Sequence, residues 1–353
     1  MSYYQGGTIK WLVSGDVHKG EIFDCEGRIT EEGLQNSSAK FLPVDSVIIA
    51  LNGQGKTRGT VAMLRTEATC NQSLVSISPR DKAKLLPEFL FWNLRGRYEE
   101  IRRMTGDDGN ERRGLNMPLI RGIRIPLPPL AEQKRIVALL DQAFAALDRA
   151  REQAEAGVND AQALFDSVLA RTFESAAERV AVIPFDSVCE PLTPRIKLKR
   201  QDYLDEGTYP IVSQEADLIS GYWDDPAALM GVDGAVVVFG DHTCCLKYVD
   251  FDFAVGADGT KVLQPASGIL AKYLYYGLRS QPIKQVGYAR HFRLLRKTTL
   301  PELPISEQGQ ISERLDQLEA QCHALEHAYE AKLADIAALR QSLLHAAFSG
   351  QLT

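Results

Sequence analysis

The sequence contains one segment twice, displaced by 175 residues and without an insertion or deletion between the copies. The pentapeptide PLAEQ at residues 129–133 returns as PISEQ at residues 304–308. A period this long indicates two large halves, because the repeats of solenoid proteins run to roughly 20–50 residues. The sequence therefore predicts a pseudo-two-fold protein. Further identities at the same displacement are Ile136 and Ile311, Leu140 and Leu315, Asp141 and Asp316, Gln142 and Gln317, Leu164 and Leu339, and Phe173 and Phe348.

Both copies have the pattern of a long helix. Apolar and small residues recur in alternating steps of four and three, which is a heptad seam. Large seam residues of one copy match small ones of the other, so the two helices can interdigitate. Gly157 and Lys332 share a seam position and are candidates for a kink. The predicted seam is Ile136, Leu140, Ala143, Leu147, Ala150, Ala154, Gly157, Ala161, Leu164 and Val168, matched by Ile311, Leu315, Leu318, Cys322, Leu325, Tyr329, Lys332, Ile336, Leu339 and Leu343.

Each predicted helix follows a proline-rich lead and carries a glutamate in its first turn, where an acid complements the helix dipole. A stalk that joins two chains is one interpretation of such helices. Long unique regions separate the two copies within one chain, however, and this favours an intramolecular antiparallel coiled coil. The pattern divides the chain into a first globular region (1–125), a central helical region (126–179), a second globular region (180–300) and a C-terminal helical region (301–353).

The two globular regions have the pattern of mixed α/β domains, so the predicted fold class is α+β. Buried strands are expected at residues 41–50 and 232–239, each after a turn signal. An aromatic helix follows in each region, at 88–95 and at 272–279. The two regions are therefore expected to be remote relatives that differ in their loops. Further short strands are expected at 60–64, 73–77, 246–251 and 261–263.

The acidic residues are concentrated in the helical regions. The whole chain has a formal net charge of −6, but residues 126–179 carry −3 and residues 301–353 carry −5, whereas residues 1–125 carry +3. Overall charge is thus a poor guide to where a polyanion could bind. The first thirty residues contain no apolar run, which predicts a cytoplasmic protein. The six cysteines show no metal-ligand spacing and are expected to be reduced.

Basic and polar residues cluster in one loop of each globular region, after the aromatic helix. Arginine, asparagine and histidine side chains can hydrogen-bond base edges, and neighbouring cations can hold phosphates. The alternative for each loop is a solvated charged segment without a ligand. The candidate DNA-binding residues are Arg112, Arg113 and Asn116 in the first loop and Arg290, His291 and Arg293 in the second.

Two motifs resemble catalytic or cofactor sites without matching them. Residues 50–57 (ALNGQGKT) follow a predicted strand and nearly form a phosphate-binding P-loop, but the first glycine is replaced and the next residues predict turn and strand rather than helix. Residues 323–327 (HALEH) match an inverted zinc-protease pattern, but Cys322 and Leu325 lie on the helix seam, the other copy has no ligands, and an exposed helix face is the better account. The sequence predicts no catalytic, cofactor-binding or metal-binding residue.

The proline-rich lead with its PLAEQ motif, the echo at 301–311 and the terminal AFSGQL at 347–352 together resemble the DNA-specificity subunit of type I restriction-modification systems. The resemblance extends over essentially the whole chain. It implies two target-recognition domains that each read half of a split duplex site, with two conserved helical regions setting the gap. It also implies that two methyltransferase subunits and the restriction/translocase subunits assemble on this chain and do the chemistry. S-adenosylmethionine, ATP and Mg are then expected on those partners.

One feature departs from that family's pattern. The second globular region opens with residues 183–188 (IPFDSV) and reaches YPIVS at 209–213, whereas the first region begins its corresponding segment near residue 9. The first region is therefore expected to lack an opening segment. Two alternatives to the specificity subunit stay open: a coiled-coil adaptor that binds no DNA, and a fragment of a fused restriction-methyltransferase enzyme.

Overall fold

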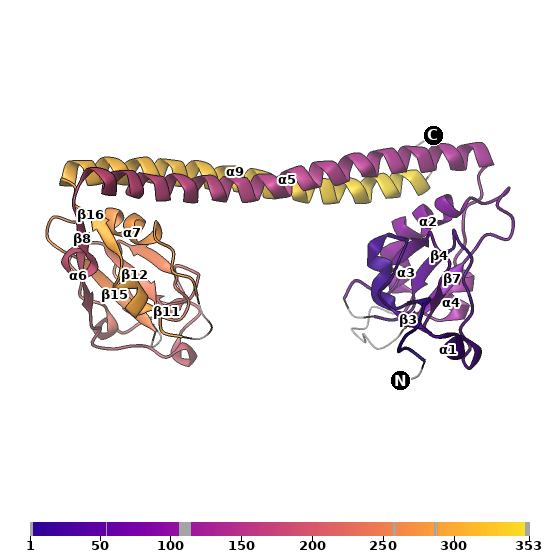
Figure 1. Cartoon of the computed structure of the whole chain (residues 1–353), viewed down its shortest axis with the longest axis horizontal. Coiled ribbons are helices and arrows are strands. Elements are labelled where there is room, and N and C mark those ends of the chain that lie inside the picture. Colours follow the sequence, from indigo (N-terminus) through magenta and orange to yellow (C-terminus); the bar gives the residue numbers. More distant parts are fainter. Residues whose placement is uncertain are drawn as a thin grey trace. The chain divides into compact units, whose positions relative to one another are not determined.

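A computed structural model gives the fold and describes residues 3–53, 55–105, 114–256, 259–285, 287 and 289–349 (Figure 1). The chain divides into two compact units. Unit 1 comprises residues 1–154 and 331–353, and unit 2 comprises residues 155–330. Within the described ranges, no helix combines the length and the apolar character that a membrane span requires.

Unit 1 is built on a four-stranded mixed sheet with the order β2-β5-β4-β7. Its central strands β4 (Val47–Ala50) and β5 (Val61–Leu64) are antiparallel and fully buried. Helix α2 (Pro87–Gly96) lies between this sheet and the long helices (Figure 1). The other elements are β1 (Ile9–Leu12), β2 (Glu21–Ile22), β3 (Arg28–Ile29), α1 (Glu31–Gln35), β6 (Thr69–Cys70), β7 (Leu74–Ile77), α3 (Tyr98–Arg103), α4 (Met117–Gly122) and the 3-10 helix Ser14–Lys19.

Unit 2 repeats this plan with the sheet order β13-β12-β15-β9. Strand β12 (Val236–Gly240) is central and buried, and helix α7 (Ala271–Arg279) covers the sheet. The prediction of two related mixed α/β domains is confirmed. The other elements are β8 (Val182–Pro184), α6 (Phe185–Val188), β9 (Cys189–Leu192), β10 (Tyr209–Val212), β11 (Gly221–Trp223), β13 (Leu246–Val249), β14 (Ala254–Val255), β15 (Thr260–Pro265), α8 (Phe292–Leu295), β16 (Thr299–Pro301) and the 3-10 helices Arg200–Asp202 and Pro226–Ala228.

The two central strands begin later than the sequence pattern predicted. In unit 1 the chain turns before Val47, and Asp45 has a positive φ of 66°. In unit 2 Gly234 has a φ of 74° and occupies the same place before Val236. A strand cannot include these conformations, so the turn takes up the first part of each predicted segment.

Helices α5 (Leu130–Arg179) and α9 (Ile305–Phe348) are the two long helices. They pack antiparallel in each unit. In unit 1 the guanidinium of Arg340 is ion-paired with Asp148, and in unit 2 that of Arg179 is 2.7 Å from a carboxylate oxygen of Glu307. The prediction of an intramolecular antiparallel helix pair is therefore confirmed.

The buried face of each helix departs from the predicted seam. Leu164, Leu325 and Leu339 are 51%, 43% and 48% exposed. Phe165 and Leu169, which are not on the predicted seam, are buried instead. A strict heptad seam contacts a single partner helix. The part of α5 around Phe165 and Leu169 packs on α7 of its own domain as well as on α9. Its buried face therefore moves round the helix.

Gly157 does not end helix α5, which continues to Arg179. A β-carbon at Gly157 would lie 2.4 Å from the ring of Tyr329 on α9. The glycine therefore makes room for a tyrosine on the facing helix, as the expected pairing of small and large residues requires. No larger residue fits at this position unless the ring moves.

The repeated motif supplies the same backbone contacts in both units. The Gln133 side chain accepts a hydrogen bond from the amide of Leu86 at 2.9 Å and donates to the carbonyls of Lys84 and Pro128 at 2.7 and 2.9 Å. The Gln308 side chain accepts from the amide of Leu270 and donates to the carbonyls of Gly268 and Leu303, all at 2.9 Å. Each fully buried glutamine thus joins the start of a long helix to the segment that enters the aromatic helix.

A repeated aspartate adds a second equivalent contact. Asp141 accepts a hydrogen bond from the indole of Trp92 at 2.8 Å, and Asp316 accepts one from the hydroxyl of Tyr276 at 2.6 Å. Burial, together with the neighbouring carboxylates of Asp316 and Glu319, raises the pKa of Tyr276, so its hydroxyl stays protonated and donates the hydrogen bond. The 175-residue repeat therefore preserves how each long helix is attached to its domain.

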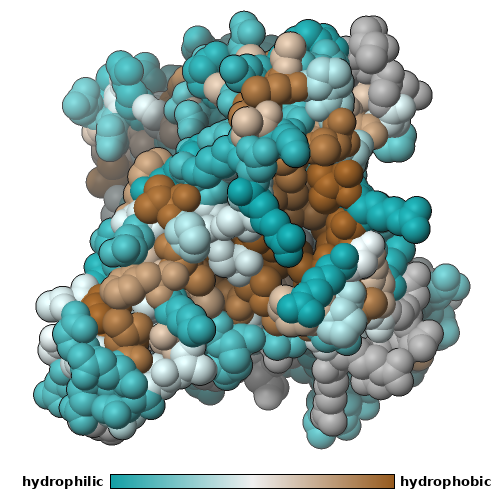
Figure 2. All heavy atoms as spheres, turned by 90° about the vertical axis from the view of Figure 1, so that its right-hand side faces the viewer, coloured by the Kyte–Doolittle hydropathy of each residue, from teal (hydrophilic) through white to brown (hydrophobic). Residues whose placement is uncertain are grey.

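The units differ at both edges of their sheets. At one edge, β2 pairs with β5 in unit 1, whereas β13, which occupies the place of β5, is the edge strand in unit 2. The other edge differs by a strand of unit 2. In unit 2 β9 pairs with β15, and β8 pairs with β16. In the described part of unit 1, β7 pairs only with β4, and nothing corresponds to β8, α6 and β9. Val75 is half-buried, whereas its counterpart Leu263 is fully buried. Figure 2 shows one face of unit 1, on which apolar side chains gather in a hollow between hydrophilic ones.

Candidate nucleic-acid interface

The first candidate loop joins α3 to α4. Arg112 and Arg113 lie outside the described residues. Asn116 is exposed and caps α4, because its side-chain oxygen accepts a hydrogen bond from the amide of Leu119 at 3.0 Å. This bond uses the acceptor of the amide group and fixes the direction in which the side chain leaves the loop.

The end of this loop is attached to the turn between β4 and β5. The amide of Leu115 donates to the carbonyl of Leu51 at 2.9 Å. A β-carbon at Gly114 would come within 1.8 Å of the side-chain oxygen of Asn52. A side chain at this position would therefore displace the amide group of Asn52, which shows how closely the end of the loop approaches the turn.

The second candidate loop precedes α8 and is attached to the corresponding turn of unit 2. Arg293, which the sequence placed in this loop, lies on α8 instead. His291 leaves only 1% of its surface exposed, and its Nδ1 lies 3.0 Å from the carbonyl oxygen of Asp241. The carboxylate of Asp241 also accepts a hydrogen bond from the amide of Phe292 at 2.7 Å. These contacts favour a role for His291 in positioning the loop over direct contact with a base.

The cations of the second loop fall into two groups. Arg296 is ion-paired with Asp186 at 2.6 Å, and this pairing raises the pKa of Arg296 further above its ordinary value. Arg290, Arg293 and Lys297 are exposed, and their side chains have no ion pair or hydrogen bond within the described ranges. Their charge is therefore available to a polyanion outside the chain.

The turns themselves were not among the sequence candidates. In unit 2 the ring Nδ1 of His242 lies 3.1 Å from the carbonyl of Ala289, and Gln285 donates to the carbonyl of His242 at 2.9 Å. In unit 1 the turn carries the exposed Lys56. The only sequence signal for the turn of unit 1 was the near match to a P-loop at residues 50–57, which includes this turn.

The two misleading motifs have ordinary structural roles. Residues 50–57 form the turn that joins β4 to the antiparallel strand β5, as the sequence predicted. His323 and His327 lie on α9, and each ring Nδ1 contacts a glutamate three residues further on, at 3.0 and 3.2 Å. Within the described ranges, no group of three histidine, cysteine, aspartate or glutamate residues could hold a metal ion.

The architecture is shared with solved specificity subunits. A chain from a structure titled for complex assembly and conformational transition of the type I R-M system superposes with a TM-score of 0.80 at 20% identity, over 97% of this chain and 92% of that one. The HsdS subunit from Thermoanaerobacter tengcongensis gives a TM-score of 0.60 at 20% identity, over 97% and 90% of the two chains. At this level of identity the likeness shows a shared fold.

Sequence comparison gives the same result. Residues 2–156 match the model of the type I restriction modification DNA specificity domain. The type I restriction enzyme EcoR124I/EcoR124II specificity subunit of Escherichia coli is 25% identical over 143 residues, which are 40% of this chain and 35% of that protein. Residues 2–156 are therefore similar to the DNA specificity domain of type I restriction-modification systems, and the chain spans about a third of the length of this curated relative.

Proposed function

We propose that the chain reads a bipartite duplex site and carries the methyltransferase and restriction subunits of a type I restriction-modification complex. The observation that carries this proposal is the repeated attachment of a loop to a hairpin turn, once in each unit, on domains of a specificity-subunit fold. Two related domains with different loops suit two different half-sites. Methylome sequencing of a host with and without this gene tests the proposal, since a bipartite methylated motif should disappear with the gene.

In this proposal the chain has no catalytic residue of its own. Methyl transfer and cleavage belong to partner subunits that bind S-adenosylmethionine, ATP and Mg. Methylation by the isolated chain would contradict this assignment. Failure to bind any duplex at low salt would favour the alternative of a coiled-coil adaptor that binds no DNA.

We predict that the acidic surfaces of α5 and α9 dock methyltransferase subunits, one on each half. Their net charge repels DNA phosphates, and the repeated attachment of the helices gives two similar sites. Native mass spectrometry at saturating partner should then give two methyltransferases per chain. A stable complex with one would contradict the prediction.

We also predict that Arg290 contacts DNA. If it reads a base, Arg290→Ala should lose about 1–3 kcal/mol of binding and relax one position of one half-site. If it holds a phosphate, affinity should fall evenly across sequences and the salt slope should decrease by about one. Binding titrations over a range of salt, with a library of duplexes, separate the two results.

Arg296→Ala is the matched control for that experiment. Arg296 lies at the other end of α8 and is already paired with Asp186. We expect its replacement to leave the recognised motif unchanged. Wild-type affinity, motif and salt dependence in Arg290→Ala would show that Arg290 belongs to a solvated loop.

A further inference from the structure

Unit 1 contains a basic cavity beside Arg95, whereas the cavity beside the corresponding Arg279 of unit 2 is also lined by the acidic Glu319. It has a volume of about 440 Å³, and its lining includes Lys56, Arg95, Tyr98, Phe144 and Arg340. This volume is within the range of ordinary small-ligand sites. All of its lining residues belong to unit 1.

Arg95 contributes a guanidinium without a carboxylate partner. It lies against three aromatic rings, with 5.6 Å to the centroid of Phe91, 5.1 Å to that of Trp92 and 5.5 Å to that of Phe144. Within the described ranges it makes no hydrogen bond and no ion pair. Burial, and then the charge of Arg340, lower the pKa of Arg95. An anion in the cavity would offset both effects.

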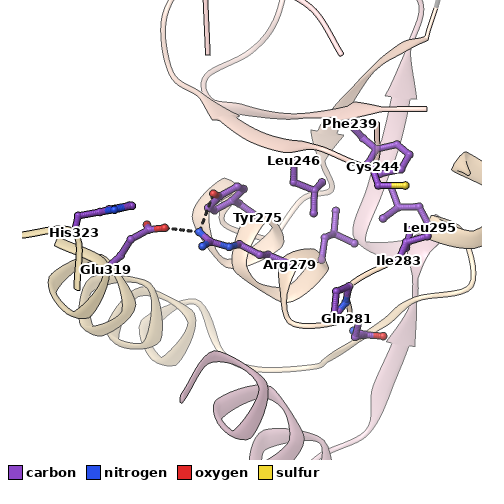
Figure 3. A pocket seen from close by; sticks show the side chains of 12 residues that line it. Phe239, Cys244, Leu246, Tyr275, Arg279, Gln281, Ile283, Leu295, Glu319 and His323 are labelled. Carbon is purple, nitrogen blue, oxygen red and sulfur yellow. Dashed lines mark hydrogen bonds and ion pairs between the residues drawn. The ribbon is translucent and has the colours of Figure 1, made fainter. Parts of the chain in front are cut away.

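The corresponding arginine of unit 2 shows what unit 1 lacks. Arg279 occupies the same place on α7 and is ion-paired with Glu319 of α9, while its guanidinium also donates to the hydroxyl of Tyr275 at 3.1 Å (Figure 3). The 175-residue repeat carries Phe144 to Glu319. Unit 2 therefore supplies an anion from its own helix, and unit 1 has a phenylalanine instead.

Lys56 adds a second uncompensated cation, on a turn that is held in place. The hydroxyl of Tyr98 donates to the carbonyl of Lys56 at 3.2 Å, and Nε2 of His18 lies 3.0 Å from the hydroxyl of Thr57. The side chain of Lys56 is exposed and has no ion pair or hydrogen bond in the part of the chain that the structure describes. The turn thus presents its ammonium group without a partner.

The charges of the cavity favour phosphate over a single carboxylate. Arg95, Arg340 and Lys56 contribute three positive charges, and Asp148, which pairs with Arg340, contributes one negative charge. A carboxylate would leave one cation uncompensated, whereas a phosphate dianion would neutralise the site. Arginine and lysine are also the side chains that commonly bind phosphate in proteins.

We propose that this cavity of unit 1 binds a phosphate group through Arg95 and Lys56, and that unit 2 has no such site. The group is either a backbone phosphate of DNA or free phosphate. The proposal does not depend on the proposed function, because inorganic phosphate can be titrated without DNA.

Calorimetric titration of the full chain with inorganic phosphate at constant ionic strength tests the proposal. We expect one saturable site per chain, and a loss of affinity of about tenfold or more in Arg95→Gln and Lys56→Ala. Lys56→Ala changes an exposed turn and leaves the core intact, so this variant still tests phosphate binding if Arg95→Gln disturbs packing. Lys134→Ala, an exposed lysine on α5, is the matched control and should bind as wild type.

Competition titrations with a duplex and with succinate show whether the site prefers phosphate to carboxylate, and whether the phosphate comes from DNA or is free. Displacement of phosphate by a duplex from the wild type, but not by succinate, assigns the site to the DNA backbone. A site that duplex does not affect takes free phosphate. The proposal is wrong if phosphate does not saturate, if succinate binds as tightly, or if both variants bind like the wild type.

Discussion

Replacement of Gln308 by leucine should lower the free energy of unfolding of unit 2 by about 2–3 kcal/mol. The side chain is fully buried and makes three hydrogen bonds to backbone groups, at Gly268, Leu270 and Leu303. Leucine has a similar size but pairs with none of them, and each unsatisfied buried group costs about 1–3 kcal/mol, less where water can reach it. Urea unfolding of the variant and the wild type measures the difference. Gln133→Leu should have a similar effect on unit 1, where the same three contacts occur.

Gln317→Leu is the matched control. Gln317 is also repeated, as Gln142, and lies on the same helix, but it is exposed. Its replacement should change stability by less than about 0.5 kcal/mol, as is usual for surface positions. Equal effects at Gln308 and Gln317 would show that the buried hydrogen bonds do not stabilise the helix attachment.

These two glutamines show what the sequence could and could not predict. Repetition at a fixed displacement identified both as parts of two related halves, and the heptad pattern correctly predicted the long helices. Neither observation distinguishes Gln308, which holds a loop through backbone groups, from Gln317, which faces solvent. Two of the three contacts of Gln308 are with residues about 40 positions earlier in the chain, and local periodicity does not report such partners.

The errors in the seam have a similar cause. Leu164 was assigned to it because it continued the alternating steps, but Phe165 is buried there and packs near Tyr276, with 6.3 Å between their ring centroids. The position of α7 determines this choice, and a helical pattern contains no information about it. Tertiary packing thus decided between two neighbouring apolar residues.

The environments of the candidate residues near α8 were predictable to different degrees. Exposure of Arg290 and Arg293 agrees with the composition of their loop, whereas burial of His291 depends on the distant Asp241. The unpaired Arg95 was not a candidate. The repeat aligns Phe144 with Glu319 in the sequence, but only the structure shows that Glu319 pairs with Arg279.

Removal of one heptad from each long helix should shorten the gap in the recognised DNA site by about three base pairs. Seven residues of helix span about 10 Å, and each base pair of duplex occupies about 3.4 Å. Residues 150–156 and 330–336 are suitable, because they lie between the Asp148–Arg340 ion pair and the contact of Gly157 with Tyr329. Seven residues turn a helix by nearly two full turns, so the remaining faces stay aligned to within about 20°. Methylome sequencing with the partner subunits measures the new gap.

A length-preserving variant controls for the loss of those side chains. Alanine at the exposed positions of the same two segments keeps both helices at full length and should leave the gap unchanged. The deletion and the alanine variant thus differ in helix length, which is the property that the bipartite model makes responsible for the gap. Both half-sites should keep their base sequences in the deletion variant, because neither candidate loop is altered. A complex that methylates the wild-type motif after the deletion would show that something other than the two helices sets the gap.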